Sequence, residues 1–427
     1  MHKFSRLAVL VLAIVVLSSS ASSAQEVRGR QFKGQVMTPA SSVEHPGDAG
    51  FRAHTHLRIL VPKEGRFEPS VKNAAGAPPV LGLFFETPAS IACVYRLVSE
   101  PRPGCNPDET TEPPSGGGGA IALVEAFDDP TAASDLHTFS TQFGLPPADL
   151  TVVFADGSKP SVDPTGSAEL ETSLDIEWAH AMAPKAKIFL VEAPSLTLSD
   201  LFQAIFVAGN LVAANGGGEV SMSFGSGEFL QETKLDQIFT ASGVVYVASA
   251  GDNPGTQYPC VSPNVVCAGG TTISRDSASG KFLLETTWQD GGGGPSLVEP
   301  RPSFQDLLVE VVGETRGTPD LSFDANPNTG VWVFDGNTFQ GSKNPLGWAV
   351  VGGTSVSAPA LAGIINAAGK FRASSQAEND EIYGEAGNSR DFRDIEFGNC
   401  GFNIGSFAKK GWDFCTGVGS DQGLHGK

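Results

Sequence analysis

The sequence predicts an α/β fold with a mostly parallel central sheet and helices on both of its faces. From residue 120 onward, short apolar runs alternate with longer amphipathic stretches, which is typical of parallel strands joined by crossover helices. The apolar runs are continuous, which indicates strands that are buried on both faces. With 427 residues, of which 40% are apolar, the chain can form a sizeable core.

The expected elements follow one another in order along the chain. We expect strands at residues 58–62, 120–124, 150–154, 188–191, 220–224, 244–248 and 265–266. We expect helices at residues 133–143, 168–183, 199–214 and 357–368. In sheets of this kind, active-site residues lie where strands end and helices begin.

The first residues have the pattern of a secretory signal peptide. A positively charged start precedes an apolar run over residues 7–17, and small residues then end at Ala24. The apolar run is shorter than the ~20 residues that a membrane-spanning helix needs. We therefore expect residues 1–24 to be removed and the mature protein to be secreted or extracellular, with the periplasm as the alternative location.

The charge of the chain excludes two classes of partner. The 28 basic and 47 acidic residues give a formal net charge of −19. Neither nucleic acid nor an anionic membrane surface attracts a polyanion, so we expect neither as a partner. Nothing in the sequence indicates an oligomer, and we expect a monomer.

Six cysteines predict disulfide bonds in an exported protein. Local pairing is the simplest of their connectivities, and metal binding is the weaker alternative because the chain has no Cys-x-x-Cys and no histidine near these cysteines. The local pairs would be Cys93/Cys105, Cys260/Cys267 and Cys400/Cys415.

The strongest local signal for chemistry is a serine in a glycine-rich segment that opens an apolar helix. Ser355 lies in the run Gly352-Gly353-Thr354-Ser355-Val356-Ser357-Ala358-Pro359. The glycines allow a substrate backbone to approach, and the helix N-terminus favours a developing negative charge. An ordinary Ser/Thr helix cap with proline in the first turn is the alternative interpretation.

A nucleophilic serine needs a base, and the histidines are poorly placed to supply it. No His-Gly-x-His-like segment follows the second expected strand. His180 lies in an apolar helix, where we expect a structural role, and His137 has no evident partner. The other histidines lie toward the two ends of the chain: His2, His45, His54, His56 and His425.

Carboxylates are better supplied than histidines. Glu171 and Asp175 are four residues apart, so they lie one turn apart on one face of the expected helix. Like charges so placed repel each other unless they share a proton or a partner, and an exposed acidic face is the alternative. Asp252 follows the expected strand at 244–248 at its carboxyl end, where a Gly-Asp-Asn turn is the alternative.

In order and context, three segments resemble those of the sedolisin family of serine-carboxyl peptidases. They are Glu171-x-x-x-Asp175, Ala250-Gly251-Asp252 and the run from Gly353 to Pro359. The flanking segments look similar too, and the likeness covers roughly residues 85–427. The resemblance implies a subtilisin-like fold and a serine endopeptidase that acts on proteins or peptides.

The resemblance also implies a role for each residue. Ser355 would attack the scissile carbonyl, and Glu171 would accept its proton and later deliver it to the leaving amine. Asp175 would hydrogen-bond Glu171 and set its orientation and proton affinity. Asp252, in its protonated form, would donate to the oxyanion, so the chemistry favours acidic pH. Residues 223–225 would supply part of the edge that pairs with an extended peptide.

The family has a calcium site near its C-terminus, which implies one structural Ca²⁺. Asp394, Ile395, Gly411 and Asp413 match its pattern, because two carboxylates and backbone carbonyls suit a hard, oxygen-seeking cation. Lys409 stands where the family has a further glycine.

Family members usually carry a long folded propeptide, and this chain has a shorter N-terminal region. We expect a signal peptide at 1–24, a short propeptide-like region at 25–84 and a peptidase domain at 85–427. A catalytically silent sedolisin-like binding protein is the main alternative function. An esterase is disfavoured because Ser355 lacks a Gly-x-Ser-x-Gly elbow.

Overall fold

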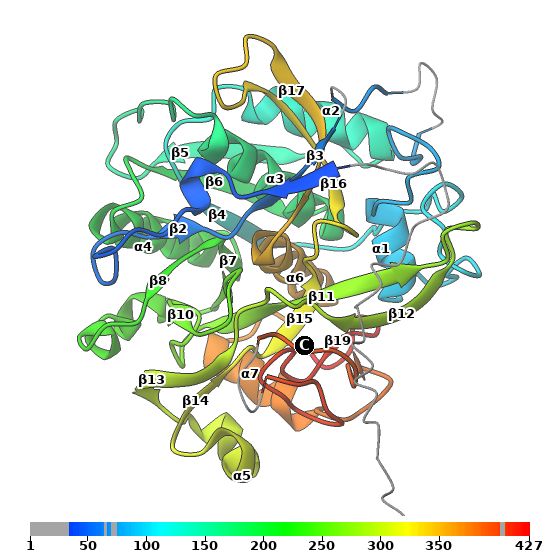
Figure 1. Ribbon diagram of the computed structural model, residues 1–427. Helices are drawn as coiled ribbons and strands as arrows, with labels where there is room; N and C mark the ends of the chain where they lie inside the picture. Colours follow the sequence, from blue (N-terminus) through cyan, green and yellow to red (C-terminus); the bar gives the residue numbers. More distant parts are fainter. Residues whose placement is uncertain (1–33, 64–65, 70–74, 402–405) are drawn as a thin grey trace, which may run out of the picture.

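The computed structural model describes residues 34–63, 66–69, 75–401 and 406–427. The predicted signal peptide, residues 1–24, lies outside the described residues. In the described part, a large and mostly parallel sheet is covered by helices on both faces (Figure 1). The chain therefore has the α/β architecture that its sequence predicts.

The central sheet has the strand order β18-β19-β15-β11-β9-β7-β4-β6-β5, with β12 paired to β11. Neighbouring strands are parallel from β5 to β19, whereas β18 and β12 pair antiparallel. The strands are β4 (Ala120–Ala126), β5 (Asp149–Phe154), β6 (Lys187–Ala193), β7 (Gly218–Met222), β9 (Val244–Ser249), β11 (Val266–Arg275), β12 (Phe282–Thr287), β15 (Leu321–Asp324), β18 (Phe392–Arg393) and β19 (Ser420–Asp421).

Helices α3 (Ser167–Met182) and α6 (Thr354–Ala368) pack against each other on one face of this sheet. Helix α2 (Ala132–Phe143) contacts α3 on the same side, and α4 (Leu198–Ala214) covers the opposite face. A Cβ at Gly363 would lie 2.6 Å from Met182 Cβ. Glycine at this position therefore allows α6 to approach α3 closely, which brings the residues at their N-terminal halves together.

The N-terminal region joins the C-terminal half in a second sheet. Its order is β1-β3-β17-β16, and all its pairs are antiparallel. The strands are β1 (Gly34–Met37), β3 (Arg58–Pro62), β16 (Val331–Thr338) and β17 (Pro345–Gly352). Strand β3 confirms the strand expected at 58–62, and the domain boundary at residue 85 stays a prediction.

A third, small sheet begins just beyond the carboxyl end of β7, a strand in the middle of the central sheet. Strand β8 (Phe224–Gly227) pairs antiparallel with β2 (His54–Thr55) on one side and with β10 (Gln257–Tyr258) on the other. The single strand expected at 220–224 is therefore wrong, because the chain leaves the central sheet after Met222 and starts a new pairing at Phe224.

Two other predicted elements are shorter than the observed ones. Strand β11 continues from Val266 to Arg275, and the sequence missed this because Gly269-Gly270 interrupts the apolar run. Helix α6 begins at Thr354 rather than at residue 357. Pro359 lies inside the helix and has no N–H to donate to Ser355 O, which lies 3.3 Å from the Ser223 hydroxyl.

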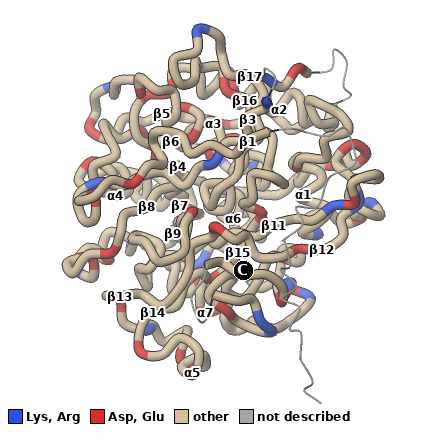
Figure 2. Tube along the Cα trace, in the orientation of Figure 1, with Lys and Arg blue, Asp and Glu red and all other residues tan. Residues whose placement is uncertain are grey.

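The remaining helices and strands are short or peripheral: α1 (Pro88–Val94), α5 (Val309–Val312), α7 (Ser375–Gly384), β13 (Gly294–Pro300) and β14 (Thr315–Thr318). The three local disulfides predicted from the sequence are confirmed: Cys93–Cys105, Cys260–Cys267 and Cys400–Cys415. Across the described residues, no helix has the length and apolar character needed to cross a membrane. Acidic and basic positions are spread over the whole trace (Figure 2).

Candidate active site

Two helices and the segment after one strand place the four predicted catalytic residues next to one another. Ser355 lies in the first turn of α6, Glu171 and Asp175 lie in α3, and Asp252 follows β9. All four are buried, with at most 2% of each residue exposed. The carboxyl groups of Asp175 and Asp252 both raise the pKa of Glu171, whereas the Ser355 hydroxyl lowers it. The structure therefore gathers the four side chains that the sequence separates by up to 184 positions (355 − 171).

The Ser355 side chain faces a segment of the N-terminal region. Its Oγ accepts from the backbone N–H of His56 at 3.0 Å and donates to Ser223 O at 3.3 Å. The backbone N–H of Ser355 donates to the carbonyl oxygen of His56 at 3.0 Å. The peptide backbone of His56 is thus bound at both the hydroxyl and the amide of Ser355.

Residues 54–57, here called the inserted segment, lie along the site as an extended peptide. His54 and Thr55 pair with Gly225 and Phe224 of β8, and His56 N–H continues the pairing by donating to Ser223 O at 3.2 Å. This is the edge at residues 223–225 that the sequence analysis assigns to peptide pairing. Here, an internal segment of the chain uses that edge.

Glu171 is a fully buried carboxyl group with unsatisfied oxygens. Within the described residues, neither Oε1 nor Oε2 has a hydrogen-bond partner. Burial raises the pKa of Glu171 well above its usual value, and the nearby Asp175 carboxyl raises it further. The Ser355 and Thr55 hydroxyls oppose this rise in pKa, so they lie near the carboxyl group.

Asp175 has different partners from those implied by the resemblance. The Ser223 hydroxyl donates to its two oxygens at 2.9 and 2.7 Å. Hydrogen bonding with the Glu125 carboxyl lowers the pKa of Asp175 and raises that of Glu125. Burial raises the pKa of Asp175 to about 7 despite these hydrogen bonds. Asp175 is thus linked to Glu171 through charge, while its hydrogen bonds go to Ser223 and Glu125.

Glu125 is a site residue that the sequence analysis missed. It lies in β4, directly after the apolar run at residues 120–124, and is 3% exposed. Its pKa is raised well above the usual value, first by burial and then by the charges of Asp175 and Glu171. The sequence signal that could have revealed Glu125 is an acid near the end of a buried strand, because acids are rarely buried without a partner.

Asp252 is held from two sides. Its Oδ1 accepts from the N–H and the hydroxyl of Thr354, at 2.7 and 3.1 Å. Its Oδ2 lies 3.4 Å from Nη1 of Arg58. Burial raises the pKa of Asp252 to about 7, and the Arg58 guanidinium is the largest influence in the opposite direction. Arg58 belongs to β3, whose pairing of Arg58 with Gly352 places it beside the start of α6.

The residues of the predicted calcium site meet in one loop region. Asp394 Oδ2 accepts from Gly411 N–H at 2.8 Å, and Asp413 Oδ2 accepts from Lys409 N–H at 3.1 Å. The Cys400–Cys415 disulfide spans this region. In the part of the chain that is described, no group of three or more His, Cys, Asp or Glu side chains could hold a metal. A cation here would therefore depend on backbone carbonyls, including those of Ile395 and Gly411.

His180 has the structural role that the sequence predicts, because it is buried in its helix and bonds Pro146 O at 2.9 Å through Nε2.

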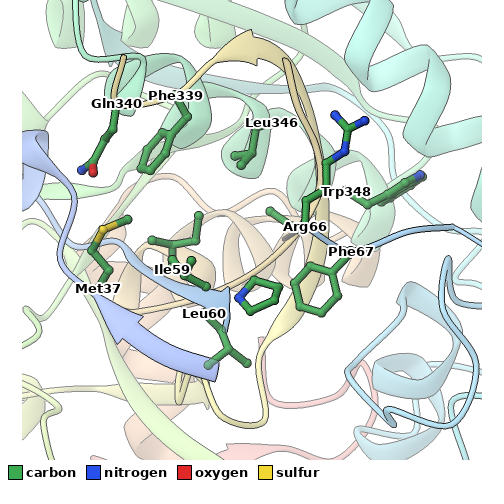
Figure 3. Close-up of a pocket in the computed structure, with 12 residues that line it drawn as sticks. Met37, Ile59, Leu60, Arg66, Phe67, Phe339, Gln340, Leu346 and Trp348 are labelled. Atoms are coloured by element: carbon green, nitrogen blue, oxygen red, sulfur yellow. The ribbon is translucent and has the colours of Figure 1, made fainter. Parts of the chain in front are cut away.

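An apolar pocket of about 260 Å³ lies away from the catalytic residues (Figure 3). It is lined by β1, β3 and the β16–β17 hairpin, including Met37, Ile59 and Trp348, and contains none of the predicted site residues.

Comparison with known proteins connects this site to a group of peptidases. No protein-family model matches the chain. The chain is 30% identical over 442 aligned positions to kumamolisin from Bacillus sp. (strain MN-32), covering 92% of this chain and 72% of that protein. It is 32% identical over 183 positions to sedolisin from Pseudomonas sp. (strain 101), covering 40% of this chain and 29% of that protein.

A solved structure supports the same relationship at the level of fold. Pseudomonas sedolisin, a serine-carboxyl proteinase complexed with two molecules of pseudo-iodotyrostatin, aligns with a TM-score of 0.64 at 22% identity. The alignment covers 82% of this chain and 96% of that one. The predicted subtilisin-like α/β fold is thereby confirmed.

Proposed function

Because the chain belongs to the sedolisin family of serine-carboxyl peptidases, we propose that it cleaves internal peptide bonds of proteins in acid, outside the cell. The observation that carries the proposal is the inserted segment, residues 54–57, which lies across Ser355 as an extended peptide. Both ends of this segment continue into the rest of the chain. The cleft thus accommodates the interior of a polypeptide, which supports endopeptidase activity rather than removal of terminal peptides.

Ser355 is the nucleophile of the proposed mechanism. Its Oγ attacks the carbonyl carbon, and ionised Glu171 takes the hydroxyl proton and later gives it to the leaving amine. The surroundings of Glu171 support this role, because the Ser355 hydroxyl is among the groups that lower its pKa and thus lies close to its carboxyl group. Glu171, Asp175 and Glu125 influence one another's pKa, so we expect the three carboxyl groups to titrate as a unit.

Asp252 is the proposed donor to the oxyanion. Its Oδ1 is occupied by two hydrogen bonds from Thr354, whereas no hydrogen bond reaches Oδ2 in the described residues. A Cβ at Gly353 would contact both Asp252 Oδ2 and the His56 carbonyl oxygen, so both oxygens border this glycine. A proton on Oδ2, together with the N–H of Ser355, would stabilise the negative charge that develops on the carbonyl oxygen.

We also assign one structural calcium ion to Asp394, Ile395, Gly411 and Asp413. The two carboxylates approach the same loop, and hard oxygen donors suit this cation. Burial raises the pKa of Asp413 to about 6, which means that its charged form is disfavoured. A bound cation would stabilise this charged form. Calcium should raise the melting temperature of the chain and of an Asp306→Asn control, but not of Asp413→Asn. An equal rise in all three would contradict the assignment.

Activity at acid pH and export follow from different observations. The pKa of Asp252 near 7 supports a reaction that needs its protonated form. Three disulfides and the signal-like residues 1–24 support an oxidising, exported location. Residues 25–84 are proposed as a short pro-region that remains in the cleft until it is cut or displaced.

The test is digestion of a denatured protein from acid to mildly alkaline pH. Wild-type protein should digest it only in acid, and Ser355→Ala and Glu171→Gln should not. Ser357→Ala, two positions along the same helix and also buried, is the matched control and should retain activity. A silent binding protein is the second candidate, favoured by the filled cleft. It predicts no digestion at any pH, including after limited proteolysis of the N-terminal region.

A further inference from the structure

The imidazole of His56 lies in an enclosed polar pocket next to Ser355. Its Nδ1 is 2.6 Å from Ser249 Oγ, and its Nε2 is 2.6 Å from Gln257 Oε1. His56 is 1% exposed, Ser249 is fully buried and Gln257 is 8% exposed. Both ring nitrogens of this histidine therefore have a dedicated partner from the body of the protein.

The chemistry of the two partners defines what the pocket accepts. An amide oxygen can only accept, so Nε2 must carry a hydrogen and donate to Gln257 Oε1. Burial lowers the pKa of His56, which favours the neutral ring, and Nδ1 then accepts from the Ser249 hydroxyl. A flat side chain with one donor and one acceptor at opposite edges satisfies both partners.

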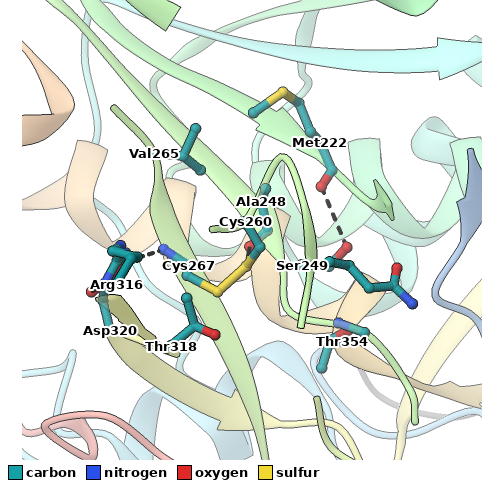
Figure 4. Close-up of a disulfide and its surroundings, with 12 residues drawn as sticks. Met222, Ala248, Ser249, Cys260, Val265, Cys267, Arg316, Thr318, Asp320 and Thr354 are labelled. Atoms are coloured by element: carbon teal, nitrogen blue, oxygen red, sulfur yellow. Dashed lines mark hydrogen bonds and ion pairs between the residues drawn. A yellow bond between two sulfur atoms is a disulfide. The ribbon is translucent and has the colours of Figure 1, made fainter. Parts of the chain in front are cut away.

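The pocket is formed by residues of β8, β9 and β10 and not by the inserted segment. Ser249 ends β9, and Gln257 begins β10. A Cβ at Gly225 of β8 would lie 2.8 Å from His56 Cε1, so glycine is needed there to admit the ring. The Cys260–Cys267 disulfide ties the loop after β10 to β11, the neighbour of β9 (Figure 4). The same view shows Met222 O near the Ser249 hydroxyl, at 3.4 Å, which is a longer contact than the 2.6 Å between this hydroxyl and His56 Nδ1.

The backbone places His56 immediately before the bond that faces the nucleophile. Its N–H donates to Ser223 O and its carbonyl oxygen accepts from Ser355 N–H. From this geometry we infer that the pocket of Ser249 and Gln257 gives the peptidase a preference for histidine on the amino side of the scissile bond. The inference rests on the proposed peptidase function and adds its substrate class.

The chain's own bond between His56 and Leu57 is the first substrate of this kind. Ser355 Oγ bonds to the His56 carbonyl carbon, the bond to Leu57 N breaks, and that nitrogen takes the proton from Glu171. Water then hydrolyses the ester, which leaves a carboxylate on His56 and free Ser355. The new end at Leu57 stays near β3, which begins at the next residue and is paired with β17.

A residue of similar size without ring nitrogens should be a poor substrate. Phenylalanine would leave Gln257 Oε1 buried without the donor that the histidine supplies, and would leave the Ser249 hydroxyl with only the long contact to Met222 O at 3.4 Å. Sites built to hydrogen-bond a polar substrate group discriminate strongly against the apolar analogue. We expect kcat/KM to be roughly 100-fold or more lower for phenylalanine than for histidine at this position.

The experiment uses the full chain at about pH 6, where part of the peptide histidine is neutral, and two peptides that differ only in histidine or phenylalanine before one bond. Wild-type protein and Gln237→Leu, an exposed control, should prefer histidine by about 100-fold or more. The preference should fall toward one in Gln257→Leu and in Ser249→Ala, with folding of each variant checked by thermal unfolding. Sequencing of the processed chain should find a new N-terminus at Leu57, and none in Ser355→Ala.

The outcomes separate this inference from the proposed function. Equal cleavage of both peptides by the wild type, or an unchanged preference in both pocket variants, would overturn the histidine preference and leave the peptidase intact. Digestion of denatured protein without cleavage of the histidine peptide would overturn it as well. Failure to digest any substrate would instead reject the peptidase function itself.

Discussion

The two sides of Ser355 each contain a buried carboxyl group with a pKa near 7, but they are built differently. Asp175 is surrounded by other acids and is hydrogen-bonded to Ser223 and Glu125. Asp252 is paired with a cation, Arg58, and bonded by Thr354. Similar pKa values thus arise from different balances of burial, hydrogen bonding and charge. In the proposed mechanism, the acid cluster on one side transfers protons, whereas the single acid on the other side holds one proton for donation to the oxyanion.

The largest expected effect compares amide substitutions on the two sides. Glu171→Gln removes the only proposed base and should lower kcat by about 10³–10⁴-fold. Asp252→Asn keeps a hydrogen-bond donor at the oxyanion, so its loss should be smaller, about 10–10²-fold. Steady-state kinetics of both variants on one substrate at the wild-type optimum measures the difference. Equal losses would remove the distinction between the two sides.

Stability should also depend on pH in a definite direction. The folded pKa of Asp175 and of Asp252 is about 7, above the reference value of 3.8. Both groups therefore contribute stability that is fully present below pH 3.8 and is lost as the pH rises through 7. The melting temperature should fall by several degrees or more between pH 4 and pH 8.

The same measurement sharpens the comparison. Asp175→Asn should reduce the loss of stability at neutral pH, because no lysine or arginine among the described residues compensates the charge of Asp175. Asp252→Asn should reduce it less, since Arg58 would lose its carboxylate partner. A wild-type melting temperature that rises from pH 4 to pH 8 would contradict the assigned protonation of both groups.

Arg58 offers a smaller and more specific test of the Asp252 side. Replacing it by methionine removes the guanidinium that lowers the pKa of Asp252. Asp252 should then keep its proton to higher pH, and the alkaline fall of kcat/KM should move upward. The rising acid side of the profile belongs to the Glu171 cluster and should stay in place, which the full pH–rate profile of Arg58→Met will measure.

The smallest effect is expected for Glu125, at the far end of the acid cluster. Glu125→Gln retains an N–H that can donate to Asp175 and should keep kcat within about 10-fold of the wild type. Glu125→Leu loses the donor and should reduce kcat further, since it leaves Asp175 with one hydrogen-bond partner fewer. Similar kcat values for the two variants would show that the hydrogen bond between residue 125 and Asp175 does not contribute to the rate.

The sequence was informative where the chemistry lies in short, local motifs. Ser355, Glu171, Asp175 and Asp252 each stand in a segment with a characteristic pattern, and the structure places all four together. The apolar runs of the central sheet were found for a related reason, because strands buried on both faces are continuous in apolar character.

The missed residues depend on contacts between distant segments. His56 and Arg58 reach the site because β2 pairs with β8 and β3 pairs with β17. No local periodicity records such long-range antiparallel pairing, so the strand predicted at 58–62 did not reveal that Arg58 reaches the site, and His56 lay in no predicted element. Glu125 was missed for another reason, since a single acid at the end of an apolar strand does not reveal which helix packs above it.

The most direct test of the central claim is the pH dependence of kcat/KM for the wild type beside Asp252→Asn. The wild type should give a bell-shaped profile in the acid range, with its alkaline fall set by the loss of the Asp252 proton. Because an amide donates at every pH, the variant should be slower but should lack this alkaline fall. An unchanged alkaline fall in Asp252→Asn would contradict a protonated Asp252 as the oxyanion donor.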